Sequence, residues 1–189
     1  MSTAENMSTA ENKTAGFFNV KDGDTFKIAG IEFIKFPDKD GMTAVVAKNI
    51  LFNSAFGDNN DLRSGQVLKR LKEEILPKII MVVGEENVCT FPTDLTAWDG
   101  LKPYGVMEEK ISLPTMDFYR ANVEIFDKYP VSNWWWLATP DTAQPHGAPT
   151  WILCVSPSGN IGLGNYSCRD NGVRPVLYFK SSIFGSSEE

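Results

Sequence analysis

Two apolar segments in the C-terminal third constrain the fold of this chain most. They are Asn133-Trp-Trp-Trp-Leu-Ala-Thr-Pro140 and Gly172-Val-Arg-Pro-Val-Leu-Tyr-Phe179. Residues 141–171 between them are rich in Gly, Pro, Ser, Thr and Asn, and their one apolar run is Trp151–Val155. Because this composition is typical of displayed loops and short hairpins, the pattern predicts a rigid frame that carries a replaceable surface.

Composition limits the classes of fold and partner. With 189 residues and 42% hydrophobic content, the chain is expected to bury one core. A formal net charge of -6 without clustered Lys or Arg argues against nucleic acid as a partner. No run is long enough for membrane insertion, and the start lacks the apolar segment of a signal peptide. We therefore expect synthesis in the cytoplasm, with the final site of display, such as a virion or a cell surface, left open.

Both ends of the chain are expected to be tails. The hexapeptide Met-Ser-Thr-Ala-Glu-Asn occurs at 1–6 and again at 7–12, and it is polar without periodicity. Residues 1–16 are therefore predicted to be a disordered tail. A single domain is expected over 17–180, followed by a flexible tail at 181–189.

The first half of the domain predicts strands and then a helix. Apolar and polar residues alternate in 26–30, 31–36 and 43–47, as in short antiparallel strands. Ser64 is expected to cap a helix that ends at Pro77. The apolar positions of that helix fall on one face and are Val67, Leu68, Leu71 and Ile75.

A second helix and a further set of strands follow. The helix is expected to begin at Pro114 and Thr115 and to stop near Lys128, after a loop region at 84–103 with one or two short strands. Further strands are expected at 134–137, 151–155 and 160–163, and a closing strand at 173–179. This order predicts an α+β fold with two helices packed on short antiparallel sheets and a loop-rich C-terminal region.

These segments resemble a known family. The W-W-x-L-A-T-P segment, the S-P-S-G hairpin and G-V-R-P-V-L are similar to the C-terminal module of C-type-lectin-fold proteins, in the branch related to formylglycine-generating enzymes. The I-E-F-I hairpin, the L-K-E-E-I-L helix and I-S-L-P-T extend the resemblance over 17–180. Within that fold the chain most resembles the variable proteins of diversity-generating retroelements. The resemblance implies a C-type lectin fold whose hypervariable surface binds ligand, on a constant scaffold.

The genetic code offers an internal check of this resemblance. Randomising both adenines of an AAC codon never yields Trp, Met, Lys, Gln or Glu, and every residue in 160–171 belongs to the permitted set. Gln144 does not, so it is expected to be constant. Within a variable region at 136–175, the residues expected to contact ligand are Asp141, Thr142, Ala143, Pro145, His146, Ala148, Pro149, Leu163, Asn165, Tyr166, Ser167, Cys168 and Asp170. The scaffold residues are expected to be Trp134, Trp135, Trp136, Trp151, Gly172, Arg174 and Pro175.

Other chemistries are weaker interpretations of the same residues. Gln144-Pro145-His146 is similar to the Gln-Pro-Asp calcium motif of true C-type lectins, but His replaces the carboxylate, so no metal is expected. His146 shows no acidic partner at a recognisable spacing, which favours a displayed loop residue. The three cysteines have irregular spacing, and a bridge between Cys154 and Cys168 is left open. Arg174 is expected to pair inside the scaffold, because a buried guanidinium needs a partner.

Three functions are carried forward. The favoured one is a non-enzymatic protein that binds an unknown protein ligand, such as a surface receptor, without a cofactor. The first alternative is a formylglycine-generating-type oxidase with Cys154 and Cys168 as metal or redox ligands. The second is a constant carbohydrate-binding module in which exposed rings of the Trp134–136 cluster stack on sugar; a glycan is the less favoured ligand.

Overall fold

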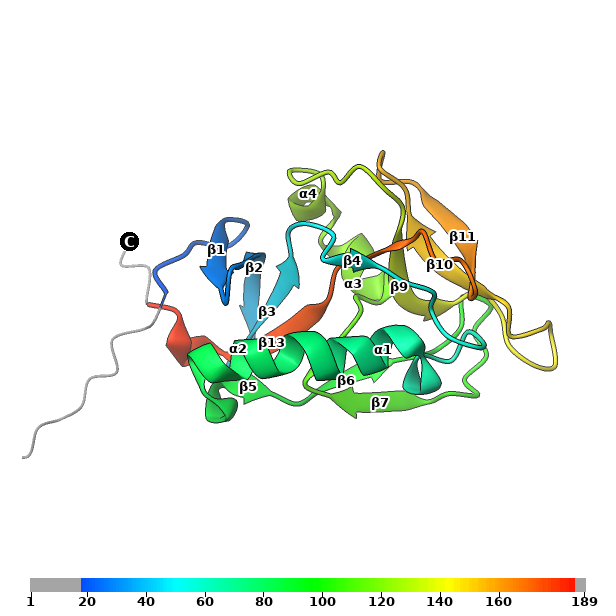
Figure 1. Cartoon of the computed structure of the whole chain (residues 1–189), viewed down its shortest axis with the longest axis horizontal. Helices are drawn as coiled ribbons and strands as arrows, with labels where there is room; N and C mark the ends of the chain where they lie inside the picture. The colour runs from blue at the N-terminus through cyan, green and yellow to red at the C-terminus, as the bar shows by residue number, and fades with distance from the viewer. Residues whose placement is uncertain (1–17, 186–189) are drawn as a thin grey trace, which may run out of the picture.

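Two β-sheets and one long helix make up most of the fold in this computed structural model, which describes residues 18–185 (Figure 1). The six-stranded sheet has the order β1-β2-β3-β13-β5, with β8 also paired to β13. The five-stranded sheet has the order β11-β10-β9-β12-β4, and β6 and β7 form a separate pair. The expected mixed α+β architecture is therefore confirmed. The predicted tail at 1–16 lies outside the described residues.

The predicted N-terminal strands are present. β1 (Thr25–Ile28) and β2 (Ile31–Lys39) pair antiparallel through a tight turn in which Ala29 and Gly30 have φ of 51° and 79°. Positive φ at both central residues matches the right-handed twist of the flanking strands. β3 (Met42–Ala47) pairs with β2 and with β13.

The long helix runs further than predicted. It consists of α1 (Gln66–Arg70), a π-helical turn η2 (Leu71–Ile75) and α2 (Leu76–Val83). The prediction that Pro77 ends it is wrong. Leu76 donates its backbone N–H to the Leu71 carbonyl, five residues back, and this widened turn accommodates the proline ring, which would clash with a carbonyl of a regular helix.

Ser64 does not cap this helix. The N-cap residue is Gly65, without a side-chain hydrogen bond, and Ser64 belongs to a 3₁₀ turn, η1 (Leu62–Ser64). The predicted apolar face is confirmed as buried, and it continues into α2 through Ile79 and Val83. No helix within residues 18–185 combines the length and the apolar character needed to span a bilayer.

The second predicted helix is divided in two. Thr115 caps α3 (Met116–Ala121) by accepting the Phe118 backbone N–H, 3.1 Å away. The chain then leaves helical geometry at Asn122, and α4 (Val123–Phe126) follows. The remaining short elements are β4 (Phe52–Asn53), η3 (Glu85–Asn87), β5 (Val88–Cys89), β6 (Phe91–Asp94), β7 (Val106–Glu109) and β8 (Ile111–Ser112).

The closing segment connects the two sheets. The sequence predicts one strand there, but the structure has β12 (Gly172–Val173) in the five-stranded sheet and β13 (Val176–Lys180) in the six-stranded sheet. Arg174 and Pro175 form the crossing between them. Both sheets therefore depend on one continuous piece of chain.

The prediction that a flexible tail starts at residue 181 is wrong for residues 181–184. Residues 181–183 form a 3₁₀ turn, η4 (Ser181–Ile183), and Ile183 and Phe184 are buried in the core. The ring of Phe184 meets that of Phe26 edge-on, with centroids 5.3 Å apart. This turn is part of the domain because it covers the end of the β1–β2 hairpin with apolar side chains.

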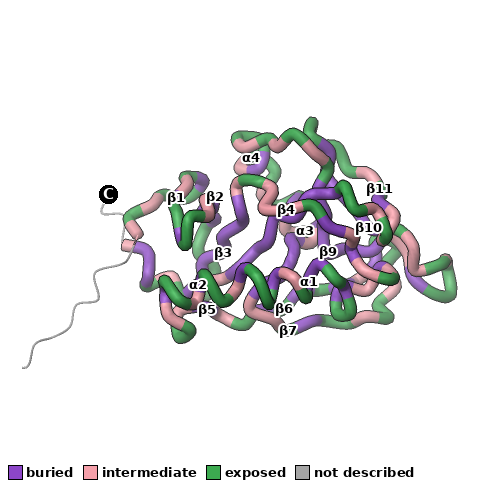
Figure 2. The backbone as a smooth tube through the Cα atoms, viewed as in Figure 1, coloured by how far each residue is buried: buried purple, intermediate pink, exposed green. Residues whose placement is uncertain are grey.

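Two apolar clusters lie on opposite sides of β9 (Trp135–Pro140). Trp136 belongs to the cluster that the long helix covers, whereas Trp135 belongs to the cluster under α3 and α4. Consecutive strand residues point to opposite faces, so the adjacent Trp135 and Trp136 pack into different apolar clusters. Figure 2 shows the resulting buried centre of the five-stranded sheet and its exposed edge.

Candidate ligand-binding surface

The two predicted contact segments meet at one end of the five-stranded sheet. One is the loop 141–150 between β9 and β10 (Trp151–Val155), which protrudes at the right in Figure 1. The other, 163–170, comprises the end of β11 (Ile161–Asn165) and the residues after it. The Tyr166 backbone N–H donates to the Thr150 carbonyl at 3.0 Å, and the Tyr166 carbonyl accepts from Phe56 at 2.8 Å. The segments thus form one continuous surface.

Asn60 holds the long loop from inside. Its fully buried side chain donates to the Thr142 carbonyl at 2.8 Å and to the Trp151 carbonyl at 3.1 Å. Its side-chain oxygen accepts the Tyr104 hydroxyl at 2.7 Å. The sequence did not identify Asn60, since an asparagine in a polar stretch resembles a surface residue. Its role depends on partners that lie far along the chain.

Asp99 holds the loop from outside. Its carboxylate accepts hydrogen bonds from the Thr142 hydroxyl and from Nδ1 of His146, the latter at 3.2 Å. The hydrogen bond from Thr142, more than that from His146, holds the pKa of Asp99 below its ordinary value. No acidic partner of His146 stands at a recognisable spacing in the sequence; folding brings Asp99 to it from 47 residues away.

Most predicted contact residues are accessible, with one exception. Ala143 is fully buried, so its assignment to the displayed set is wrong: its side chain faces the interior of the loop. Pro145, His146, Ala148, Leu163, Ser167 and Asp170 are exposed. The half-buried members are Asp141, Thr142, Pro149, Asn165, Tyr166 and Cys168.

The predicted scaffold set is also mixed. Trp135, Trp136, Gly172, Arg174 and Pro175 are buried as expected. In contrast, Trp134 and Trp151 expose 40% and 42% of their surface. A large apolar ring at this exposure contributes less to the core and is available for contact.

The two exposed tryptophans lie on opposite faces of the five-stranded sheet. Trp134 lies against Gly162 and Trp136 against Gly164, where an added Cβ would come within 2.5 Å and 2.4 Å of the rings. Trp151 pairs with Asn165 on the other face, the same face as Leu163. One flat sugar-stacking platform made of both rings is therefore excluded by the geometry.

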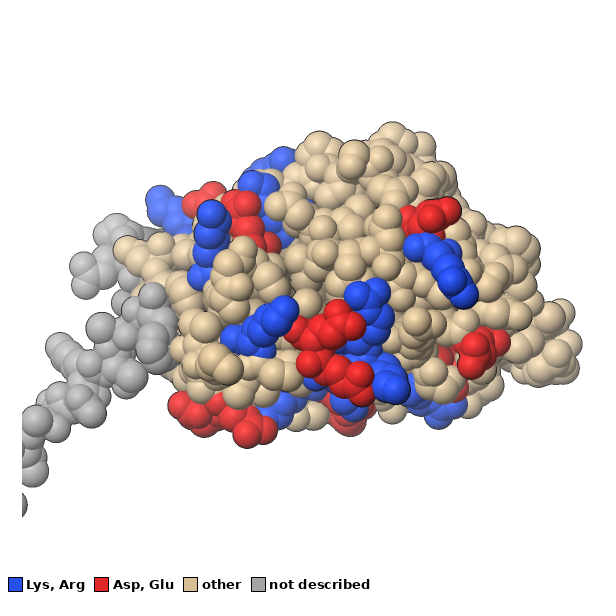
Figure 3. Space-filling view, in the orientation of Figure 1, with Lys and Arg blue, Asp and Glu red and all other residues tan. Residues whose placement is uncertain are grey.

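Charge is unevenly distributed over the molecule. In Figure 3 the region over β10 and β11 carries few charged side chains, whereas Lys, Arg, Asp and Glu gather along the long helix. Exposed apolar side chains on β10 and β11 are Trp151, Ile161 and Leu163. A surface poor in charge and containing aromatic and aliphatic side chains suits a protein partner.

Cys154 and Cys168 are free thiols. The bridge between them that the sequence left open is therefore not formed. Both line a hollow of about 320 Å³ together with Trp134 and Asn171. Burial raises the pKa of the Cys154 thiol to about 12. Within residues 18–185, no group of three or more His, Cys, Asp or Glu side chains is arranged to hold a metal ion.

Comparison of the chain with family models, with curated proteins and with solved structures finds no match. The assignment of function consequently depends on the residues and on the geometry described above.

Proposed function

We propose that this chain is a non-enzymatic binding protein of the C-type lectin fold, with a ligand-contacting surface that a diversity-generating retroelement varies. The surface consists of the accessible residues in 141–150 and 163–170. Its ligand is a protein, such as a receptor on another cell or virus. Ala143 is excluded because it is buried.

One observation carries the proposal: side chains that face solvent sit on backbone held by residues outside both segments. The Asn60 side chain donates to the Thr142 carbonyl, the Asp99 backbone N–H donates to the Asp141 carbonyl at 3.2 Å, and the Phe56 backbone N–H donates to the Tyr166 carbonyl. Side chains can therefore be exchanged while the backbone keeps its course. Preorganised backbone lowers the ordering cost of binding, which suits a scaffold that must bind through many alternative surfaces.

A genomic observation tests the variable-protein origin. A near-copy of the coding segment for about 136–175 is expected beside a reverse transcriptase gene, with differences concentrated at adenines of the copy. Sibling isolates should differ at the accessible positions and agree at Trp135, Trp136 and Gly172. A locus with neither copy nor reverse transcriptase would contradict the proposal.

A thiol experiment separates the binding protein from the oxidase alternative. Cys154 is expected to resist alkylation near pH 8, because a thiol with a pKa of about 12 stays protonated there. Mass spectrometry of the alkylated protein and metal analysis of the purified chain provide the measurement. Tight copper binding that disappears in both Cys154→Ser and Cys168→Ser would instead support the oxidase.

The half-exposed rings keep a carbohydrate ligand as the second candidate. Because Trp134 and Trp151 lie on opposite faces, a glycan would use only one of them. Binding on a glycan array that is lost in Trp134→Ala or in Trp151→Ala, but retained in the other variant, would favour this alternative over a protein ligand.

A further inference from the structure

Arg174 is a buried cation that forms no ion pair with any residue in 18–185. The residue is 2% exposed and sits where the chain crosses between the two sheets. Its Nε donates to the Ala47 carbonyl at 3.0 Å. The guanidinium lies 4.7 Å from the ring centroid of Trp135 and 5.5 Å from that of Phe126. The expected pairing inside the scaffold is thus present at one nitrogen and at two aromatic faces.

The far end of the guanidinium lacks a partner. Its buried Nη2 has no hydrogen-bond acceptor among the described residues. A buried charged donor that is left unsatisfied is destabilising, and aromatic faces offset only part of that cost. Desolvation lowers the pKa of Arg174 to about 10, so the group remains charged near neutral pH.

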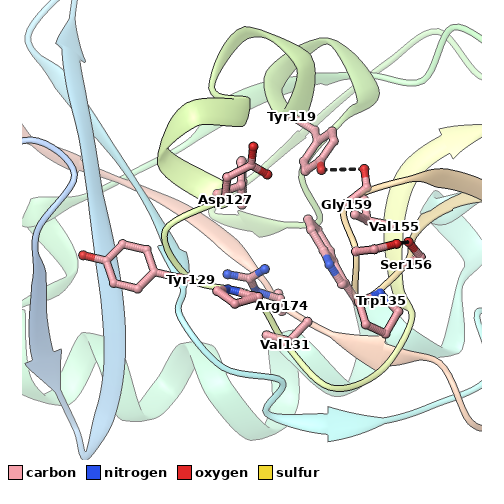
Figure 4. Close-up of a pocket in the computed structure, with 13 residues that line it drawn as sticks. Tyr119, Asp127, Tyr129, Val131, Trp135, Val155, Ser156, Gly159 and Arg174 are labelled. Atoms are coloured by element: carbon pink, nitrogen blue, oxygen red, sulfur yellow. Dashed lines mark hydrogen bonds between the residues drawn. The ribbon is translucent and has the colours of Figure 1, made fainter.

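Arg174 also lines a pocket. The pocket measures about 310 Å³ and is formed by the end of α4, the segment after it, β9 and the turn between β10 and β11. In Figure 4 Arg174 lies at the centre of the labelled residues, with Trp135 on one side and Tyr129 on the other. The Tyr119 hydroxyl donates to the Gly159 carbonyl at 3.0 Å and so connects α3 to the turn between β10 and β11 at one side of the pocket.

The lining defines what kind of molecule fits. The apolar lining residues are Trp135, Val131 and Val155, and the hydroxyl-bearing ones are Ser156 and Ser158. The exposed Asp127 also lines the pocket. A single guanidinium balances one negative charge, and Asp127 opposes a second. This combination favours a monoanion with an apolar body over a phosphate dianion.

We propose that this pocket binds a small organic carboxylate, whose oxygens accept a hydrogen bond from the guanidinium of Arg174 while its apolar part packs against Trp135. The site lies away from the surface formed by 141–150 and 163–170, so it does not depend on the proposed function. A bound carboxylate would complete the partners of Arg174 and reinforce the crossing between the sheets.

Benzoate and benzamide test this assignment on the full chain, because they share shape and differ in charge. Each is titrated into ¹⁵N-labelled protein while the Trp135 indole N–H and the Arg174 Nε–H are followed by NMR. Benzoate is expected to shift both resonances saturably and to bind at least about tenfold tighter than benzamide, since only it forms charge-assisted hydrogen bonds. Inorganic phosphate is expected to bind more weakly than benzoate.

Variants locate the site. Arg174→Met removes the charge at similar volume and is expected to weaken benzoate binding by at least about tenfold. Arg120→Met is the matched control, because Arg120 is exposed and pairs with Asp117 on α3; it should leave affinity unchanged. Asp127→Asn, which removes a repelling charge at constant shape, should tighten benzoate binding.

Three results would overturn the proposal. They are equal binding of benzoate and benzamide, phosphate binding as tight as benzoate, and no shift of either resonance at tens of millimolar benzoate. If Arg174→Met does not fold, two measurements still test the proposal. They are the comparison of benzoate, benzamide and phosphate on the unmodified chain, and the change in benzoate affinity in Asp127→Asn.

Discussion

At the level of single residues, the five-stranded sheet separates positions that accept substitution from positions that do not. Gly162 and Gly164 both lie in the region predicted to vary, and both belong to the residue types that a randomised AAC codon can encode. Their surroundings differ, because Gly164 lies under the buried Trp136 whereas Gly162 lies under the half-exposed Trp134. Tolerance of substitution at each glycine therefore depends on whether the neighbouring ring can move.

This difference predicts unequal costs for the same mutation. Gly164→Ala is expected to lower the free energy of unfolding by about 1–3 kcal/mol, because Trp136 and Asn171 leave no room for a methyl group. Gly162→Ala should cost less than about 1 kcal/mol, since Trp134 can swing toward solvent. Urea denaturation of the two variants measures the difference, and equal losses would show that Trp134 is as fixed as Trp136.

Asp99 predicts a pH dependence of the displayed loop. Its pKa is lowered in the folded chain, chiefly by the hydrogen bond from Thr142. A lowered folded-state pKa means that the carboxylate stabilises the folded loop above its unfolded pKa of about 3.9 and loses this effect as pH falls through the folded value.

Below about pH 4 the loop 141–150 should accordingly exchange its amide hydrogens faster relative to the sheet. Hydrogen exchange followed by mass spectrometry from neutral to acid pH provides the measurement. Asp99→Asn is the control: it should show fast exchange without the acid transition. An unchanged transition in that variant would assign it to another group.

At the level of elements, helix boundaries follow from individual hydrogen bonds more than from composition. Thr115 and Ser64 both precede an apolar periodic segment, and only Ser64 was predicted to be an N-cap. Only Thr115 accepts a backbone N–H of its helix, whereas the Ser64 hydroxyl donates to the Asp61 carbonyl at 3.3 Å. The 3₁₀ turn before α1 takes Ser64 out of register with the helix.

The two residues provide a matched pair for measurement. Thr115→Ala is expected to cost about 1 kcal/mol through the lost cap, and Ser64→Ala to stay within about 0.5 kcal/mol of the unmodified chain. Thermal denaturation of each variant by circular dichroism distinguishes them. If Ser64→Ala destabilised the protein more than Thr115→Ala, the assignment of caps would be reversed.

At the level of the whole molecule, the crossing at Arg174 and Pro175 couples the two sheets. β12 and β13 are two residues apart and belong to different sheets. The cluster under α3 and α4 also contains side chains from both, including Val176 of β13 and Trp135 of β9. Loss of either sheet would therefore expose apolar surface of the other.

We therefore predict a single cooperative unfolding transition. Tryptophan fluorescence reports mainly on the five-stranded sheet, and hydrogen exchange of β2 and β3 reports on the six-stranded one; their urea midpoints should coincide. Trp135→Ala, expected to cost about 3–5 kcal/mol, should shift both midpoints together. His146→Ala changes a surface residue, so it should leave both midpoints nearly unchanged and alter the free energy of unfolding by no more than about 0.5 kcal/mol. Two separate midpoints would mean that the sheets unfold independently.

Local sequence patterns were enough for β1 to β3, for the buried face of the long helix and for the accessibility of most residues in 141–150 and 163–170. Alternation and helical periodicity depend on residues a few positions apart, so a single sequence carries them. The mixed α+β class follows from the same patterns, and the apolar anchors around 141–171 indicated which side chains form the frame.

Long-range contacts account for what the sequence alone did not identify. Asn60 meets Thr142, Asp99 meets His146, and the closing segment changes sheets at Arg174, in each case through residues far apart in the chain. The burial of Ala143 and the missing partner of Arg174 depend on the same packing. A residue's hydrogen-bonding capacity can be seen in the sequence, but which partners satisfy it is settled only when the chain folds.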